Sequence, residues 1–362
     1  MCRFRLLIIT QVLDPDHPIL GFFYKWVFEM AKLIERIHVI TYHSSGRPAN
    51  NVLVYTTSKK RSIPRDTKSK FKGRARRLIS LLIMTFKVNL LMLKAVKMGG
   101  FDVILCHMNP EFVLASWPLA KLLRKPIAFW YLHKGRSLRL ILAYKLADRI
   151  FTGHRSGAPA GPKTKVLSHG IEIPDKLSSL SKPIILYVGR VSKSKRVDIL
   201  IDGFKKAKNL LPSEISRIIK LRIIGPIDFE YSRLDASEGI ELVGPVPHKK
   251  IWNEYLNSMI FVSASTTGLD KSVLEAMASG LPVLVSDEIY RETLEDLFEI
   301  CSFKNSNDLA QKISMLIINR ELREKIGKAC RDKVLKYHSI EKFIPKLVSE
   351  LKLMRLSSQV LE

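Results

Sequence analysis

The feature that most constrains the fold of this chain is the alternation of short apolar runs with amphipathic stretches. Such runs suit strands covered on both faces, and such stretches suit helices that pack one side on a sheet. Because parallel strands need a crossover between them, the alternation predicts a parallel, doubly wound α/β sheet. In the first half we expect strands at 6–10, 39–42, 101–107, 126–131, 149–152 and 165–168, and helices at 21–35 and 111–123. The first helix is expected to bury Phe22, Trp26, Val27, Met30, Ala31 and Ile34.

The length of the chain predicts more than one such domain. At 362 residues it exceeds the size at which a single hydrophobic core usually stops growing. A polar linker at 172–182 lies near the middle, and the segment from Ser339 to Leu356 is strongly helical. We therefore expect a first Rossmann-like domain at 1–174, a second at 175–336, and a final helical segment at 337–362.

The first motif with chemical content begins the second half. The apolar run Ile184–Val188 ends in Gly189-Arg190, and a basic loop with Lys195 leads into an amphipathic helix. Ligands of doubly wound sheets bind at the carboxyl ends of strands. Arg190 and Lys195 could there neutralise a leaving diphosphate, although solvated loop cations are the simpler interpretation of these two residues alone.

The second motif lies about eighty residues later. Ser272 followed by Glu275 has the pattern of a capping box, which predicts a helix start at Ser272. Gly280 is a stop signal, and Val283–Val285 is suited to a buried strand. A glycine-containing loop that leads into a helix N-terminus favours a phosphate. Glu275 could contact a ribose or serve only as a backbone cap.

Together these segments resemble the retaining, nucleotide-sugar-dependent glycosyltransferases of family 4. The matching residues are Gly189, Arg190, Lys195, Val197, Asp198, Gly268 and the run from Leu274 to Val283. The resemblance is specific over roughly 182–290 and looser elsewhere. It implies the GT-B fold, in which two doubly wound Rossmann-like domains face each other across a cleft.

The resemblance also implies roles for individual residues. It gives catalytic roles to Arg190, Lys195 and His133. The donor would be bound by Gly21, Gly189, Val246, Ser272, Val273 and Glu275. The acceptor side or the cleft would hold His169. Apart from the resemblance, Asp270 and Lys271 could offer polar contacts there or lie in a surface loop. No metal and no cofactor are implied, the donor being a UDP- or GDP-linked sugar; the Asp14-Pro15-Asp16 sequence is not expected to bind a metal.

Three positions depart from the family pattern. Thr267 stands where a second glutamate is usual, Arg196 replaces a glycine, and Gly21 is the one glycine left of a pair. Two functions follow. The first is a retaining hexosyltransferase acting on a hydroxyl acceptor, such as a lipid-linked or cell-surface glycan precursor. The alternative is a transfer-inactive GT-B partner in a membrane-associated glycan-assembly complex; a related epimerase or phosphorylase is a third, weaker option.

Charge is concentrated in the first half of the chain. The net charge is +26, and residues 1–180 carry 31 Lys and Arg against 10 Asp and Glu. The densest part is residues 59–84, where cations precede an apolar stretch. This segment could be a solvated loop, a contact with an anionic membrane surface, or, least favoured, a nucleic-acid site. We expect the membrane contact.

The apolar runs and the cysteines of the sequence indicate where in the cell the chain is located. The run at 6–13 is too short for a secretory core and is interpreted as the first strand. The stretch 78–93 is interrupted by Lys87 and Asn89 and falls short of about 20 apolar residues, so no membrane span is expected there. Four cysteines have no paired spacing. We expect a cytoplasmic chain that is peripheral to the inner face of the membrane.

Overall fold

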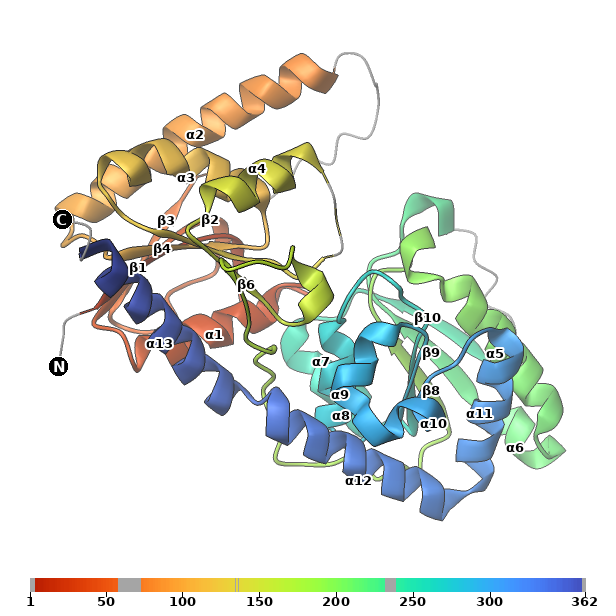
Figure 1. Cartoon of the computed structure of the whole chain (residues 1–362). Helices are drawn as coiled ribbons and strands as arrows, with labels where there is room; N and C mark the ends of the chain where they lie inside the picture. Colours follow the sequence, from red (N-terminus) through yellow and green to blue (C-terminus); the bar gives the residue numbers. More distant parts are fainter. Residues whose placement is uncertain (1–3, 58–72, 134, 136, 232–238, 360–362) are drawn as a thin grey trace. The chain divides into compact units, whose positions relative to one another are not determined.

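The computed structural model describes residues 4–57, 73–133, 135, 137–231 and 239–359 (Figure 1). The chain divides into two compact units. Unit 1 comprises residues 1–167 and 344–362, and unit 2 comprises residues 168–343. The sequence placed the corresponding boundaries at 174 and 336. Both units are parallel α/β sheets, as the alternation of apolar runs predicted.

Unit 1 contains a seven-stranded sheet in the order β3-β2-β1-β4-β5-β6-β7, in which every pairing is parallel. The order turns back between β1 and β4, which makes the sheet doubly wound. Its strands are β1 Arg5–Leu13, β2 Arg36–Ser44, β3 Val52–Thr56, β4 Val103–His107, β5 Ile127–Trp130, β6 Arg149–Thr152 and β7 Thr164–Val166.

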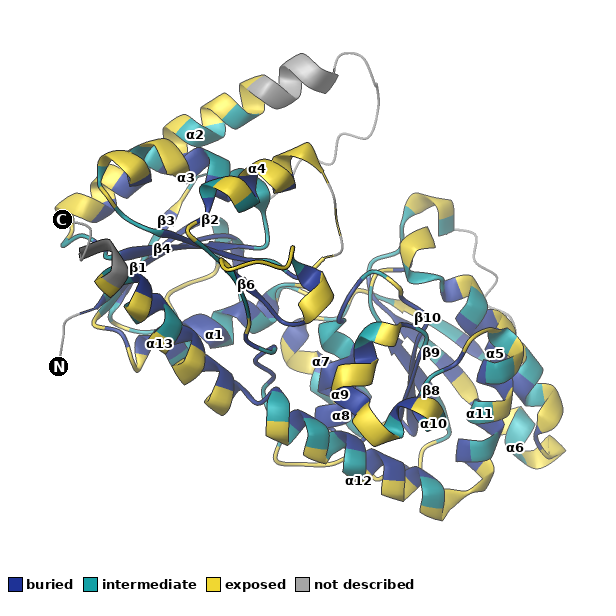
Figure 2. Ribbon diagram, in the orientation of Figure 1, coloured by how far each residue is buried: buried dark blue, intermediate teal, exposed yellow. Residues whose placement is uncertain are grey.

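Helices cover both faces of this sheet. One face carries α2 (Gly73–Lys97), α3 (Pro110–Leu122) and α4 (Leu138–Leu146), whose inner side chains share a core with the strands. The other carries α1 (Gly21–Ala31) and the part of α13 (Ile340–Gln359) that belongs to unit 1 (Figure 1). Figure 2 shows the strands buried between these two helical layers.

Unit 2 contains a five-stranded parallel sheet in the order β10-β9-β8-β11-β12. Its strands are β8 Ile184–Val188, β9 Lys220–Ile224, β10 Ile240–Gly244, β11 Ile260–Ser263 and β12 Val283–Val285. Its helices are α5 Val197–Leu210, α6 Ser213–Ile218, α7 His248–Leu256, α8 Lys271–Ala278, α9 Arg291–Leu294, α10 Phe298–Cys301, α11 Ser306–Ile318 and α12 Arg320–Tyr337. One hydrophobic core unites these elements.

Local predictions failed at a few places. The sequence missed β3 and α4. It also put Phe22 on the buried face of α1, where Phe23 is the fully buried residue. Phe22 is half-buried and packs edge-on against Phe23 and Trp26. At helical spacing Phe23 lies in the middle of the stripe formed by Trp26, Val27 and Met30, and Phe22 lies at its edge, so the pattern favours Phe23 as the buried residue.

Helix α2 extends beyond the apolar stretch seen in the sequence and ends at Lys97. Within the described residues, Ile79–Lys97 is the one stretch of helix whose length and composition would allow it to cross a membrane, and 17% of it is buried. Its inward residues Val88, Met92 and Ala95 belong to the core of unit 1. The structure therefore shows α2 as a surface helix of this unit.

Candidate functional site

The candidate site begins at the carboxyl end of β8. Ile185, Leu186 and Tyr187 are buried, and the chain leaves the sheet at Gly189. The Gly189 amide donates to the Ile224 carbonyl of β9 at 2.9 Å, and the Tyr187 hydroxyl donates to the Arg190 carbonyl at 2.9 Å. These bonds hold the backbone on both sides of Gly189 while the Arg190 side chain is exposed.

Lys195 lies in the turn that follows. The chain makes a single 3-10 turn over Lys193–Lys195 and enters α5 through Arg196, which has a φ of 51°. A left-handed residue is unfavourable unless it is glycine. This conformation suits the glycine that the resembled family pattern has at this position, and here Arg196 adopts it.

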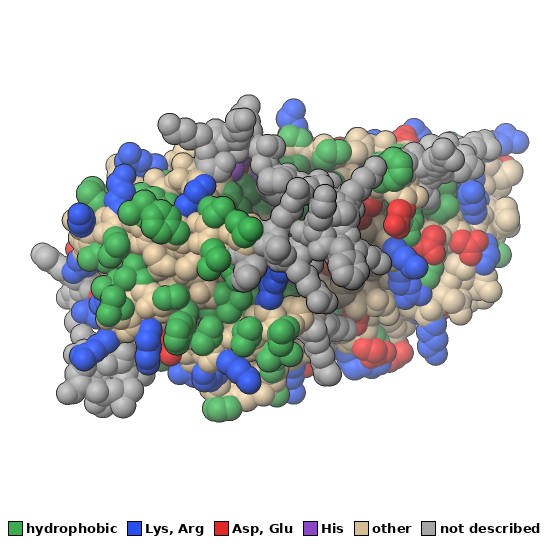
Figure 3. Space-filling model, turned by 90° about the horizontal axis from the view of Figure 1, so that it is seen from above, with side chains coloured by type: hydrophobic (Ala, Val, Ile, Leu, Met, Phe, Trp, Pro, Cys, Tyr) green, Lys and Arg blue, Asp and Glu red, His purple; other side chains and the backbone are tan. Residues whose placement is uncertain are grey.

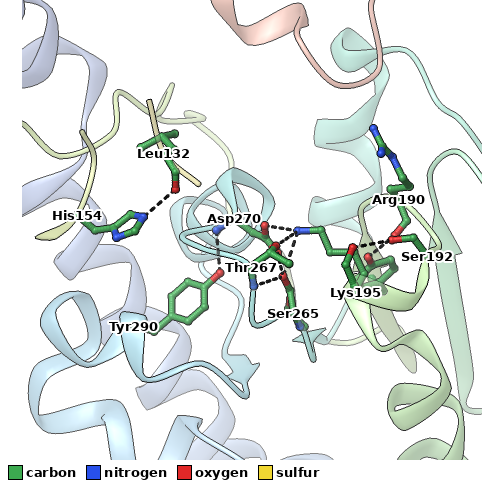
Figure 4. Close-up of polar contacts among 12 residues, drawn as sticks. Leu132, His154, Arg190, Ser192, Lys195, Ser265, Thr267, Asp270 and Tyr290 are labelled. Carbon is green, nitrogen blue, oxygen red and sulfur yellow. Dashed lines mark hydrogen bonds and ion pairs between the residues drawn. The ribbon is translucent and has the colours of Figure 1, made fainter. Parts of the chain in front are cut away.

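The Lys195 ammonium is directed at the loop that precedes α8 (Figure 4). It donates to Ser265 Oγ and Thr267 Oγ1, each at 3.1 Å, and forms a 2.5 Å ion pair with Asp270 Oδ1. The Ser265 and Thr267 hydroxyls are themselves 3.0 Å apart. The structure thus brings the predicted Lys195 and Asp270 together, with two hydroxyls beside them.

The predicted capping box is not formed. Helix α8 begins at Lys271, its N-cap residue is Asp270, and no side chain caps the helix. Ser272 lies inside the first turn. The Asp270 carboxylate is held by Lys195, while its backbone amide donates to the Tyr290 hydroxyl at 2.9 Å. Tertiary contacts of Asp270 therefore decide where the helix starts, which a local pattern cannot register. The stop at Gly280, with φ of 78°, is as predicted.

Glu275 lies at the centre of a second polar group. Its carboxylate is buried and accepts from Tyr255 Oη at 3.1 Å, and it pairs with Lys271 one turn earlier. His248 Nε2 lies 2.9 Å from Glu275 Oε1 and 2.9 Å from the Lys271 Nζ. Because Nε2 cannot donate and accept at once, it serves one of these neighbours at a time. Glu275 is therefore not a backbone cap.

This environment sets the charge state of Glu275. Burial by itself would raise the pKa of the carboxyl, but the positive charge of Lys271 and the contact with His248 outweigh it and lower the pKa to about 2. Burial lowers the pKa of the Lys271 ammonium, and Glu275 opposes that change. At neutral pH Glu275 is a carboxylate whose charge is largely balanced within the protein.

The other predicted residues are distributed over both units. Val246 is half-buried after β10, Val273 is buried in α8, and His169 is buried at the start of unit 2, where its backbone amide donates to His338 Nδ1 at 3.2 Å. Gly21 is buried at the start of α1 and His133 is exposed after β5, both in unit 1. Their expected roles stay predictions.

Sequence reasoning missed Ser265 beside Lys195 and the two partners of Glu275, His248 and Tyr255. His248 and Tyr255 belong to α7 and reach Glu275 across 27 and 20 residues of sequence, respectively. The sequence signal for them was a helix start after Pro247, which does not indicate which residue they would contact. No group of three or more His, Cys, Asp or Glu side chains that could hold a metal ion occurs in the described part of the chain.

Comparison with known proteins gives this geometry a context. Residues 171–333 match the family model described as glycosyl transferases group 1. Sulfoquinovosyl transferase SQD2 of Arabidopsis thaliana is 26% identical over 234 residues, which are 57% of this chain and 43% of that protein. The chain spans less than half the length of the curated relatives it matches.

Solved structures resemble the whole chain. Sucrose-phosphate synthase from Thermosynechococcus elongatus aligns with a TM-score of 0.75 at 16% identity, over 98% of this chain and all of that one. Anabaena HepE in complex with UDP-glucose aligns with a TM-score of 0.70 at 16% identity, over 97% of this chain and all of that one. Together with the match over unit 2, these likenesses support the GT-B superfamily of glycosyltransferases, and the fold is a two-domain, Rossmann-like GT-B fold.

Proposed function

We propose that this chain is a glycosyltransferase that moves a sugar from a nucleoside diphosphate sugar to a hydroxyl group, with retention at the anomeric carbon. The observation that carries the proposal is the position of Lys195. Its ammonium lies between the turn after β8 and the start of α8, with Arg190 in the same loop. The match of residues 171–333 to a glycosyltransferase family covers this region.

The chemistry that this arrangement supports is stabilisation of a departing diphosphate. Negative charge grows on the leaving group as the bond to the sugar breaks, and fixed cations lower the free energy of that transition state. Arg190 and Lys195 supply two charges, and the N-terminus of α8, with Ser272 and Val273 in its first turn, supplies amide dipoles. In this proposal Glu275 and the backbone near Val246 receive the nucleoside.

Donor binding would require one exchange of partners. Lys195 is already paired with Asp270, so a diphosphate has to replace the carboxylate as the partner of the ammonium. The Ser265 and Thr267 hydroxyls lie at the same ammonium and can stay hydrogen-bonded during that exchange. The strength of the Lys195–Asp270 ion pair therefore sets the free-energy cost of freeing Lys195 for the donor.

A donor screen tests the proposal. The full chain is incubated with UDP- and GDP-linked sugars, and the released nucleoside diphosphate is measured. Lys195→Ala and Arg190→Ala should each lower turnover by about a hundredfold or more with folding intact. The matched control is Lys193→Ala, which removes an exposed cation from the same turn and should retain turnover. Near-normal turnover in both site variants would refute the assigned roles.

The alternative function is that of a transfer-inactive partner in a glycan-assembly complex. Its motive is Thr267, which occupies the position of a usual glutamate and hydrogen-bonds Lys195. Calorimetry with UDP- and GDP-sugars separates the two functions. Binding without any released sugar or transfer product would favour the partner.

The proposal includes an acceptor, an ion requirement and a location. The acceptor is proposed to be a lipid-linked or cell-surface glycan precursor, reached from the cytoplasmic face of an anionic membrane through residues 59–84. Residues 58–72 lie outside the described part of the chain. Transfer is proposed to need no metal, since protein cations take the role of balancing the diphosphate. Turnover should then survive EDTA.

A further inference from the structure

Helix α2 of unit 1 has two apolar sides, and one of them faces solvent. Val88, Met92 and Ala95 point into the core. A helical residue turns by about 100°, so side chains near the opposite side of the helix recur three or four positions apart. That opposite side is strongly exposed, with exposed fractions of 55% for Ile79, 60% for Leu82, 51% for Ile83, 71% for Phe86, 56% for Leu90 and 44% for Leu93.

The exposed apolar surface continues across two neighbouring helices. Helix α3 packs against both α2 and α4 on the same face of the sheet. It adds Trp117 and Leu122, and α4 adds Leu138, Ile141 and Leu142, all exposed. We call the exposed apolar residues of α2, α3 and α4 the outer apolar face. Large contiguous apolar surfaces of this kind mark sites of interaction with a protein or a membrane.

The charges around the outer apolar face are almost all positive. The sequences of α2 and α4 contain no Asp or Glu. The acidic residue of α3, Glu111, is paired with Arg139 of α4 at 2.5 Å. Lys87, Lys94 and Lys121 are exposed on the same helices. Figure 3, which looks onto this side, shows apolar side chains spread over the surface of unit 1 with Lys and Arg side chains among them.

We infer that the outer apolar face of α2, α3 and α4 binds an anionic lipid surface, with its apolar side chains inserted between the headgroups. Cations beside exposed apolar side chains are the arrangement of interfacial helices. The same charge disfavours a second copy of this chain, because two such faces would bring cations together. A transmembrane position of α2 would remove Val88, Met92 and Ala95 from the core of unit 1.

This inference is independent of sugar transfer, and it extends the proposed contact beyond residues 59–84. The polybasic segment would act through charge alone, so salt should release it. Insertion of Leu82, Phe86 and Leu90 would instead leave a part of the binding that persists at high salt. The two contributions can be measured separately.

Vesicle flotation of the full chain tests the inference. The probes are vesicles of phosphatidylcholine alone and of phosphatidylcholine with about 30% phosphatidylglycerol, at about 0.1 M and 0.5 M salt. The wild type should bind the anionic vesicles at both salt concentrations. The variant Leu82→Gln/Phe86→Gln/Leu90→Gln should bind at least about tenfold less at both. Brominated lipid should quench Trp117, the exposed tryptophan of α3.

A matched control replaces the same number of exposed apolar residues in unit 2. Leu210→Gln/Ile218→Gln/Ile318→Gln removes side chains with exposed fractions of 54%, 57% and 60%, and it should bind vesicles as the wild type does. Circular dichroism and thermal melting check that both variants are folded. The inference is overturned by a wild type that stays unbound, or by equal loss in both triple variants. The inference is also overturned if the wild type is a dimer and the triple variant of α2 is a monomer, because the outer apolar face would then join two copies of the chain.

Discussion

The side chain on which the proposed chemistry depends most, Lys195, is already ion-paired in the structure. Its ammonium holds Asp270, Ser265 and Thr267 at once. Both members of the ion pair are about one-fifth exposed. A pair that is partly shielded from water has to be broken at a cost, and an arriving diphosphate meets that cost through its own charge-assisted hydrogen bonds.

The first prediction follows from this competition. Asp270→Asn removes the competing charge but keeps the shape, so UDP should bind about three- to tenfold more tightly. Titration calorimetry with UDP measures the change. The control is Asp198→Asn, which removes an exposed acid from the first turn of α5. Unchanged or weaker UDP affinity in Asp270→Asn would show that the carboxylate does not compete with the diphosphate.

A second prediction concerns the buried Glu275 carboxylate. Glu275→Gln takes the nearest carboxylate away from Lys271 in a buried setting, which should lower the free energy of unfolding by about 3 kcal/mol. Adding Lys271→Met should recover part of the loss, because the buried cation is then gone as well. Urea unfolding of the two variants and the wild type measures both effects. A double variant less stable than Glu275→Gln would contradict the explanation.

The low pKa of Glu275 also makes the stability depend on pH. A carboxyl with a lower pKa in the folded state binds fewer protons there, so its stabilisation is complete above the ordinary value of 4.5 and is lost as the pH falls towards about 2. Over this range the free energy of unfolding should fall more steeply in the wild type than in Glu275→Gln. Parallel slopes would show that Glu275 is not the titrating group.

At the scale of elements, adjacent strand ends position Arg190. Gly225 follows β9 with φ of 141°, and a Cβ there would overlap the carbonyl of Gly189 at the end of β8. Gly244 ends β10 with φ of 78°, and a Cβ there would meet no atom within 4 Å. Both glycines thus have a positive φ, which disfavours a side chain, but of the two Gly225 is the one that also leaves space for its neighbour.

Alanine at these two positions gives a matched pair of variants. Gly244→Ala should cost about 1 kcal/mol through backbone strain alone. Gly225→Ala should cost more, since it also pushes the Gly189 backbone, and it should weaken UDP binding through Arg190. Thermal unfolding and calorimetry measure the two quantities. Equal effects of the two substitutions on UDP affinity would remove the proposed link between Gly225 and Arg190.

The sequence predicted the elements whose identity depends on local pattern. The strand Ile184–Val188, the helix after Lys195 and the stop at Gly280 follow from apolar runs and turn residues, and all three are confirmed. The start of α8 was wrong because Asp270 is held by distant Lys195 and Tyr290. Patterns within a few residues do not encode such contacts.

The same contrast between local patterns and distant contacts applies to the candidate site. The position of Arg190 and Lys195 after a buried strand could be predicted because it is a property of their own segment, and their roles stay predictions. The partners of Glu275 could not, because His248 and Tyr255 reach it from another helix. The sequence of a helix does not show whether a charged side chain such as Glu275 faces water or a buried cation.

At the scale of the molecule, the chain passes from unit 1 to unit 2 and back again. Residues 344–362 belong with unit 1, although they follow unit 2 in sequence. Lys165 pairs with Glu350 at 2.5 Å, and Arg355 lies 3.7 Å from Asp102, so α13 is joined to two other parts of unit 1. Its buried residues in this unit are Ile344, Leu347, Val348, Leu351 and Met354.

Removal of this segment should therefore affect one unit only. A chain ending at Phe343 should lose the thermal transition of unit 1, since those buried side chains are gone, while residues 168–343 keep a cooperative transition and UDP binding. Differential scanning calorimetry with and without UDP measures both. Glu350→Gln is the control, and a single partly exposed ion pair should cost under about 1 kcal/mol. An intact unit 1 transition without α13 would contradict this account.

The return of α13 to unit 1 has a consequence during translation. A ribosome delivers the first 167 residues early, yet the helix that completes their domain emerges only after the whole intervening domain has been made. At about 5–20 residues per second the delay is roughly 10 to 40 s. For that interval the face of the nascent seven-stranded sheet that carries α1 lacks the rest of its cover, so chaperone capture of the growing polypeptide is to be expected before α13 arrives.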